Sequence, residues 1–147
     1  MITWFTVKIG KVLLLVPLSP QGILASTSVH VIVNFSSIPS TVSRSETTSS
    51  VTSFNWDDAV WMKKISTRDT LDIIDVMGLD PGSRWTVGSG STQNTTLVRK
   101  VSVFDGQVDW AIGATECDVF SQNTEDSLGT HTKNLCPSSA TFTVATF

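Results

Sequence analysis

The sequence is organised around residues 28–35, which read Ser-Val-His-Val-Ile-Val-Asn-Phe. Apolar side chains occupy every second position, while His30 and Asn34 fall on the opposite side. This period of two predicts a half-buried strand, and β-branched residues fit a pleated surface. The side chains expected to point into a core are Val29, Val31, Val33 and Phe35.

A second apolar run precedes this strand. Residues 11–20 read Lys-Val-Leu-Leu-Leu-Val-Pro-Leu-Ser-Pro. The run is too short for a membrane span and suits a strand buried on both faces. Pro17 and Pro20 lack the N–H donor and end it. With the break at Gln21-Gly22, the two runs predict a β-hairpin or the corner of a β-sandwich.

The N-terminal residues allow two interpretations. Alternation over residues 1–10 predicts a strand that ends at Gly10. The rival interpretation is a secretory signal, with Lys8 and Lys11 as the charged region, residues 12–18 as the apolar core and residues 23–25 as the cleavage site. Trp4 and Phe5, which precede both lysines, and the Pro17-Leu18-Ser19-Pro20 segment argue against the signal.

Composition limits the classes of function. The 147 residues fit one domain of ordinary size, and the net charge of −3, without a run of Lys or Arg, gives no nucleic-acid-binding motif. Cys117 and Cys136 are the only cysteines, and the chain has two His residues, so a zinc site is not expected. The two cysteines are expected either as free thiols or, in an oxidising compartment, as one disulfide.

Residues 39–54 differ sharply from their surroundings. They are mostly Ser and Thr, with few side chains to bury. Such a segment gains little to offset its loss of conformational entropy. We therefore predict a linker here, between a first β region at residues 1–38 and a second at residues 55–147.

Residues 54–65 predict the one short helix. Asn55 or Asp57 would cap its start, Asp57 and Asp58 would lie in its first turn, and two lysines would lie at its end. Capping accounts for the two adjacent acids, so they need no metal or acid–base role.

The remaining chain predicts mainly strands. Residues 70–77 are ambiguous between helix and strand, whereas residues 85–87, 97–103 and 108–112 are expected as strands, with a hairpin turn at Asp105-Gly106. Residues 113–138 are expected to be irregular. A last strand is expected at residues 140–147. The predicted fold class is all-β, an antiparallel β-sandwich (partial jelly roll) with one short helix.

No group of residues forms a recognisable catalytic motif. His30 and His131 accompany no nucleophile motif, and the glycines at residues 88–91 precede neither a helix nor a phosphate-binding lysine. The acids at 69, 72, 75 and 80 lack the spacing of a calcium loop. The five tryptophans are interpreted as core residues. We therefore predict that the chain is not an enzyme and has no catalytic, cofactor-binding or metal-binding residues.

Two stretches resemble a picornavirus-like capsid polyprotein, whose coat proteins are jelly rolls. Residues 10–20 followed by 26–36 resemble the last two strands of one jelly roll. Residues 61–68, Trp-Met-Lys-Lys-Ile-Ser-Thr-Arg, resemble the entry of the next capsid domain, and residues 84–91 and 94–103 resemble its first strands. The resemblance implies that residues 1–38 close one jelly roll and residues 55–147 open another.

Two functions follow as hypotheses. The first is a structural protein of an icosahedral capsid, found in the virion or host cytoplasm, whose partners are other capsid subunits of the same or a different kind. The second is a secreted β-sandwich binding module with a Cys117–Cys136 disulfide and N-glycans at Asn34 and Asn94, which both begin glycosylation sequons. Neither hypothesis includes a membrane span.

Overall fold

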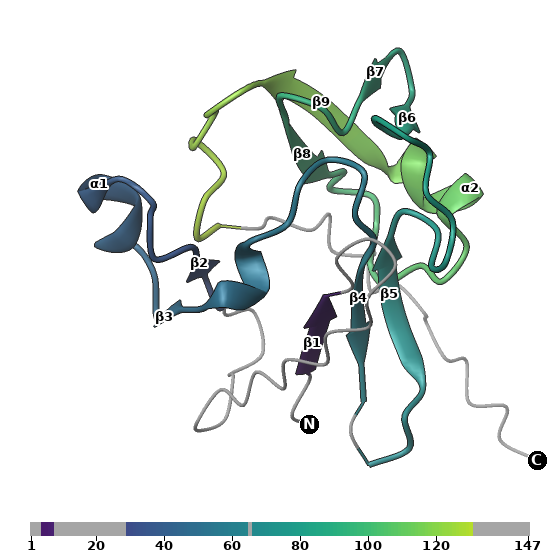
Figure 1. The fold of residues 1–147 in the computed structure, drawn as a ribbon, viewed down its shortest axis with the longest axis horizontal. Helices are drawn as coiled ribbons and strands as arrows, with labels where there is room; N and C mark the ends of the chain where they lie inside the picture. The colour runs from purple at the N-terminus through teal and green to yellow at the C-terminus, as the bar shows by residue number, and fades with distance from the viewer. Residues whose placement is uncertain (1–3, 8–28, 65, 131–147) are drawn as a thin grey trace, which may run out of the picture.

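The computed structural model describes residues 4–7, 29–64 and 66–130, and for residues 4–7 it describes the backbone alone. Short strands predominate within these ranges, and the helices are few and brief (Figure 1). The chain is therefore a small β-rich fold, as the number of expected strands predicts.

The largest sheet has three antiparallel strands, β1 (Trp4–Val7), β4 (Val60–Lys63) and β5 (Thr70–Ile74), in the order β1-β4-β5. In the central strand Trp61 is buried and lies opposite Ile73, which is also buried. The pairing shifts between Met62 and Lys63, where the sheet has a bulge. The strand predicted within residues 1–10 is confirmed by β1, and the ambiguity over residues 70–77 is settled in favour of a strand.

The helix predicted over residues 54–65 is wrong. Asn55 and Asp58 do form a local cap, because the Asn55 N–H donates to Asp58 Oδ2 at 2.9 Å and the Asp58 N–H donates to the Asn55 carbonyl at 3.3 Å. The turn stops there, and β4 follows with partners on both sides. Pairing to two strands satisfies the backbone of β4 and buries Trp61, which outweighs the helical spacing of the side chains.

A two-stranded parallel sheet joins β2 (Ile32–Val33) to β3 (Thr47–Thr48), with helix α1 (Pro39–Val42) between them in the chain. This pairing corrects the expectation of a wholly antiparallel fold. A 3₁₀ turn, η1 (Ser50–Thr52), follows, and its N-cap Ser49 accepts a hydrogen bond from the Val51 N–H.

The end of the Ser/Thr-rich tract predicted as a linker, residues 39–54, is packed, although most of its residues are exposed. Val51 is only 3 % exposed and contacts Ile32 and Val60. Ser49 is also buried, and its N–H donates to the Val33 carbonyl at 2.9 Å. This part of the tract is held by the burial of Val51 and by backbone hydrogen bonds from residues 46–49 to the carbonyls of Val31 and Val33.

The alternating register around β2 is confirmed at its centre and wrong at its ends. Val31 and Val33 are buried, and His30 is turned to the Thr47 hydroxyl at 3.0 Å. Val29 is exposed, and Phe35 is 67 % exposed. The strand is only two residues long, because the chain turns directly after it with the Ser37 N–H donating to the Asn34 carbonyl.

Two antiparallel pairs complete the sheets and lie near one another at the top of Figure 1. The hairpin pairs β6 (Thr86–Val87) with β7 (Gly90–Ser91), and the second pair joins β8 (Thr95–Arg99) to β9 (Cys117–Ser121). A Cβ atom on Gly90 would lie 2.9 Å from Val119 Cγ1. Glycine therefore permits the hairpin to approach β9 closely.

The region after β8 departs from the prediction in two places. Helix α2 (Trp110–Gly113) replaces the strand expected at residues 108–112, because the Asp109 carboxylate accepts from the Ala111 N–H and caps a helical turn. The 3₁₀ turn η2 (Ala114–Glu116) and β9 then occupy part of the stretch expected to be irregular. The Asp105-Gly106 dipeptide is not a hairpin turn, since β8 pairs with β9 instead.

Several predictions concern residues outside the described ranges. These are the apolar run at residues 11–20, the alternative signal segment, the strand at residues 140–147, His131 and Cys136.

Candidate functional site

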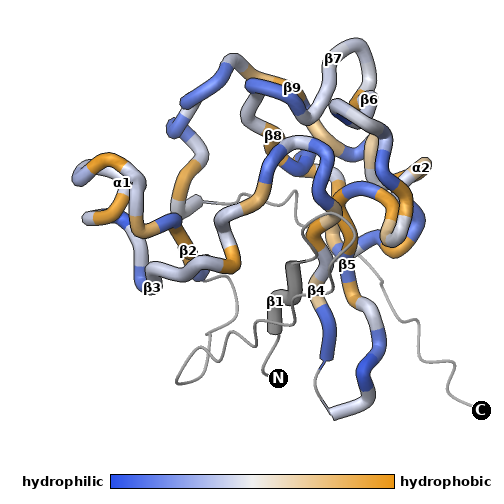
Figure 2. Tube along the Cα trace, viewed as in Figure 1, coloured by the Kyte–Doolittle hydropathy of each residue, from blue (hydrophilic) through white to orange (hydrophobic). Residues whose placement is uncertain are grey.

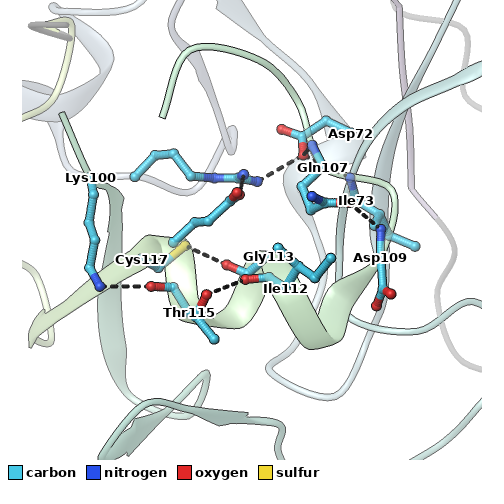
Figure 3. A network of polar contacts seen from close by, with 11 residues as sticks. Asp72, Ile73, Lys100, Gln107, Asp109, Ile112, Gly113, Thr115 and Cys117 are labelled. Atoms are coloured by element: carbon cyan, nitrogen blue, oxygen red, sulfur yellow. Dashed lines mark hydrogen bonds and ion pairs between the residues drawn. The ribbon is translucent and has the colours of Figure 1, made fainter. Parts of the chain in front are cut away.

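A polar network joins β5 to the region around α2, and Figure 3 shows it. Its centre is Asp72 Oδ1, which accepts three hydrogen bonds: from Arg99 Nη2 at 2.8 Å, from the Gln107 N–H at 2.9 Å and from the Ile73 N–H at 3.0 Å. The Ile73 N–H also donates to the Gln107 carbonyl at 2.9 Å. The carboxylate of Asp72 thus has a cation and two backbone donors.

Arg99 extends the network to η2. Its Nη1 donates to Glu116 Oε2 at 2.6 Å, and its side chain is 18 % exposed. Close by, Lys100 Nζ donates to the Thr115 carbonyl at 2.7 Å. Each charged member of the network has a partner of opposite charge or a carbonyl, so its role is to hold β5, β8 and η2 together.

Two further features show that this network is structural. A Cβ atom on Gly106 would lie 2.1 Å from the Leu71 carbonyl oxygen, so only glycine allows the 100–109 loop to lie so near β5. Cys117 is half-buried, has no disulfide partner among the described residues, and its Sγ contacts the Gly113 carbonyl at 3.7 Å. Burial raises the pKa of the Cys117 thiol, which keeps it protonated and a poor nucleophile.

A cleft of about 460 Å³ lies elsewhere, between the loop before β4, the end of β5 and the start of β8. This volume falls in the range of small-molecule sites. Aromatic side chains, amides, hydroxyls and acids line it: Phe54, Asn55, Trp56, Asp58, Val60, Ile74, Asp75, Thr92, Asn94, Thr95, Thr96, Leu97, Gln122, Asn123, Thr124 and Glu125.

Backbone contacts fix the 54–58 wall of the cleft. The Asn55–Asp58 turn closes it locally, and Thr92 Oγ1 donates to the Trp56 carbonyl at 2.5 Å. Trp85 Nε1 donates to the Asp57 carbonyl at 3.4 Å. The wall is therefore tied to residues on both sides of the β6–β7 hairpin.

Asp75 is the unusual residue of this cleft. It directly follows β5, is 2 % exposed, and its Oδ1 has no hydrogen-bond partner among the described residues. Burial, followed by the negative charges of Asp57 and Asp58, raises the pKa of Asp75 to about 8. Its backbone also adopts a left-handed conformation, with φ of 73°. The protein thus holds a protonated carboxyl at the wall of a cleft near neutral pH.

A second candidate feature is apolar surface. In the turn between β2 and α1, Phe35 is 67 % exposed and Ile38 is 61 % exposed. Figure 2 shows apolar residues in the segment around α1, away from the three-stranded sheet. Large side chains exposed in this way often mark a surface that another protein covers.

The residues considered from sequence fall in different places. Asp72 and Asp75 serve separate sites, and the described part of the chain contains no group of three metal-ligating side chains. The glycines at 88–91 form the β6–β7 hairpin, with Gly88 at φ of 56°. Of the tryptophans, Trp61 and Trp110 are buried as expected, whereas Trp56 is 41 % exposed at the cleft.

The two sequons also differ. Asn94 is exposed and lies in a turn with φ of 53°, directly before β8. Asn34 is half-buried, and its Nδ2 donates to Ser53 Oγ at 2.7 Å. The Asn34 side chain is therefore engaged in a hydrogen bond, whereas none is found for the Asn94 side chain among the described residues.

Comparison of the chain with protein-family models, with curated proteins and with solved structures gives no match in any of the three. Among the described residues, no helix has both the length and the apolar character that crossing a bilayer requires.

Proposed function

We propose that this chain is a non-enzymatic structural protein, a subunit segment of an icosahedral viral capsid that acts through packing of β-sandwich domains. The observation that carries the proposal is the exposed apolar pair, Phe35 and Ile38, presented by a β-rich scaffold. The resemblance of residues 10–20, 26–36, 84–91 and 94–103 to jelly-roll strands suggests the type of assembly. The virion and the host cytoplasm are the corresponding locations.

The occupant of the apolar turn in this proposal is another capsid subunit. Contacts between such subunits bury apolar side chains at the centre of each interface. Phe35 lies in a tight turn, in which the Ser37 N–H donates to the Asn34 carbonyl at 3.1 Å, and Ile38 follows as the N-cap of α1. Two large apolar side chains only three residues apart can be covered by one neighbouring subunit.

The test is self-association of the purified 147-residue chain, measured by sedimentation velocity over a range of concentrations. We expect oligomers that increase with concentration, and we expect Phe35→Ser combined with Ile38→Ser to shift the protein to monomer. Val108→Ser is the matched control, because it removes a similarly exposed apolar side chain from a different loop. A chain that is monomeric at every concentration, or a double variant that associates as well as the parent, would contradict the proposal.

The second candidate is a secreted, disulfide-bonded β-sandwich binding module, and the exposed Asn94 turn favours it. An oligosaccharide transferase needs an exposed sequon, and Asn94 meets that requirement better than Asn34 does. In this candidate Cys117 would form a disulfide with Cys136, closing a loop of about twenty residues and adding roughly 3 kcal/mol to stability.

Intact mass after alkylation of natively produced protein, without reductant, separates the two candidates. Two alkyl groups on unglycosylated protein fit the capsid proposal, since thiols made in the cytosol stay reduced. No alkyl group, together with glycan mass on Asn94, would replace it with the secreted module. Alkylation is performed on unfolded protein, because burial slows the reaction of Cys117 in the native state.

A further inference from the structure

Three of the residues that line the cleft beside Asp75 are acids. Asp58, Asp75 and Glu125 line it, and Asp57 lies close enough to act on Asp75 electrostatically. None of the described residues that line it is Lys or Arg. Arg44, which does not line the cleft, pairs through Nη1 with Glu125 Oε2 at 3.8 Å. Arg44 offsets part of the charge of Glu125, and the described residues that line the cleft beside Asp75 include no cation.

Asp75 gives an independent indication that something is bound here. A carboxyl oxygen that is buried and has no hydrogen-bond partner is costly, and native proteins rarely keep one without reason. Asp72, three residues earlier, shows that the fold can supply three donors to a carboxylate. At Asp75 the missing donor would come from a molecule in the cleft.

The rest of the wall restricts the kind of molecule. Phe54 and Trp56 are both exposed and line the same cleft as Asp75, which provides aromatic surface for an organic group. Trp and Phe faces attract cations, and Trp does so most strongly. A hydrated metal ion would gain little from the aromatic surface of Phe54 and Trp56. A ligand with a carboxylate or phosphate group would be repelled by the acids.

We propose that this cleft binds a small organic cation, a protonated amine with an attached apolar group, whose ammonium N–H bonds Asp75 Oδ1 and whose apolar part packs against Trp56 and Phe54. The site is additional to the subunit contact at Phe35 and Ile38, and it does not depend on the chain being a capsid protein.

Binding has a defined proton balance. The empty site holds Asp75 as a neutral carboxyl, and the ligand enters as R–NH₃⁺. The ammonium charge favours the carboxylate form, so the Asp75 proton is released to buffer while the amine keeps all three of its own protons. Asp57 and Asp58, which oppose ionisation of Asp75 in the empty site, attract the incoming cation.

The test is isothermal titration calorimetry of the full chain with phenethylammonium chloride, repeated at about pH 6.5 in buffers of different ionisation enthalpy. Phenethyl alcohol is the matched neutral ligand. We expect saturable binding of the ammonium salt, release of a proton on binding, and at least about tenfold weaker binding of the alcohol. Equal binding of the two ligands, or no saturable heat with the ammonium salt, would overturn the proposal.

Three variants locate the site. Asp75→Asn is expected to weaken ammonium binding by at least about tenfold and to abolish proton release, because the amide cannot ionise. Trp56→Leu is expected to weaken binding severalfold without changing proton release. Asp118→Asn removes an equal charge from the exposed face of β9 and is expected to change affinity by less than about twofold. If Asp75→Asn binds as the parent does, or if Asp118→Asn weakens binding as much, the assignment to this cleft is wrong.

Discussion

Asp72 and Asp75 lie three residues apart and have opposite environments. Asp72 is within β5 and accepts from Arg99 and from two backbone N–H groups. Asp75 follows the same strand, is more deeply buried, and leaves Oδ1 without a partner among the described residues. The Asp72 carboxylate is hydrogen-bonded by the protein, whereas the Asp75 carboxyl is buried and its Oδ1 lacks a hydrogen-bond donor among the described residues.

The difference shows what each region contributes. The Asp72 network stabilises the fold, because removing any member leaves another charge poorly paired. Asp75 destabilises the fold at neutral pH, because its buried carboxyl lacks a hydrogen-bond partner among the described residues. Residues that reduce stability in this way often belong to functional sites. The comparison predicts effects of opposite sign when the two sites are altered.

The largest loss of stability is expected when an unpaired carboxylate replaces a buried apolar side chain that does not line the cleft. Val31 is buried, and its Cγ2 lies 3.6 Å from the place of a Cβ on Gly129. Val31→Asp should lower the free energy of unfolding by at least about 3 kcal/mol, enough to unfold a marginally stable chain. Val29→Asp is the control, because Val29 is exposed. Thermal melting of both variants checks the prediction, and an unchanged transition for Val31→Asp would contradict the register of β2.

A smaller loss is expected in the Asp72 network. Arg99→Met keeps the bulk of the side chain but leaves Asp72 and Glu116 without their shared cation. We expect a loss of roughly 2 kcal/mol in urea unfolding, less than for a fully buried pair because the side chains retain some exposure. Adding Glu116→Gln should restore part of the loss. Arg84→Met, at an exposed arginine, should change stability by less than about 0.5 kcal/mol. Equal effects of the two arginine variants would show that the network contributes nothing.

A gain of stability is expected at Asp75. Its folded pKa of about 8 exceeds the ordinary 3.8, so between these values the folded protein holds a proton that the unfolded chain has released. Stability therefore falls as pH rises from about 4 to about 8 and remains reduced above that range. Asp75→Asn should remove this fall and add roughly 1 to 3 kcal/mol at about pH 8, with little gain at about pH 4. Urea unfolding as a function of pH measures it, and a variant with the parent's pH dependence would refute the assignment.

Local patterns predicted the parts of the fold that depend on local chemistry. The alternation around Val31 and Val33 correctly identified a buried face, whereas the one hairpin turn predicted, at Asp105-Gly106, is wrong because β8 pairs with β9. The segment around Trp61 was predicted as a helix because its capping and charge pattern are helical. Its strand state depends on β1 and β5, which lie elsewhere in the sequence. A single window of sequence contains no information about those partners.

The candidate site was not predicted, for a related reason. Asp75 was considered only as one of four acids with unsuitable calcium-loop spacing, and Asp57 and Asp58 only as helix caps. The sequence gives no sign that Asp75 is enclosed beside them, because the cleft is built from the 54–58 loop, β5 and the start of β8. Asp tolerates a positive φ better than most residues, which fits the backbone at Asp75. The sequence alone, however, does not predict this conformation.

The contacts of α1 have a consequence for the order of folding. Thr41 Oγ1 donates to Glu125 Oε1 at 2.6 Å, across 84 residues of chain, and Arg44 Nη2 donates to the Leu128 carbonyl at 2.6 Å. During synthesis α1 leaves the ribosome long before residues 125–128 exist. Closing so long a loop is entropically unfavourable until the intervening sheets have formed. We therefore expect α1, although made early, to dock late, after the β8–β9 pair has brought its partners into position.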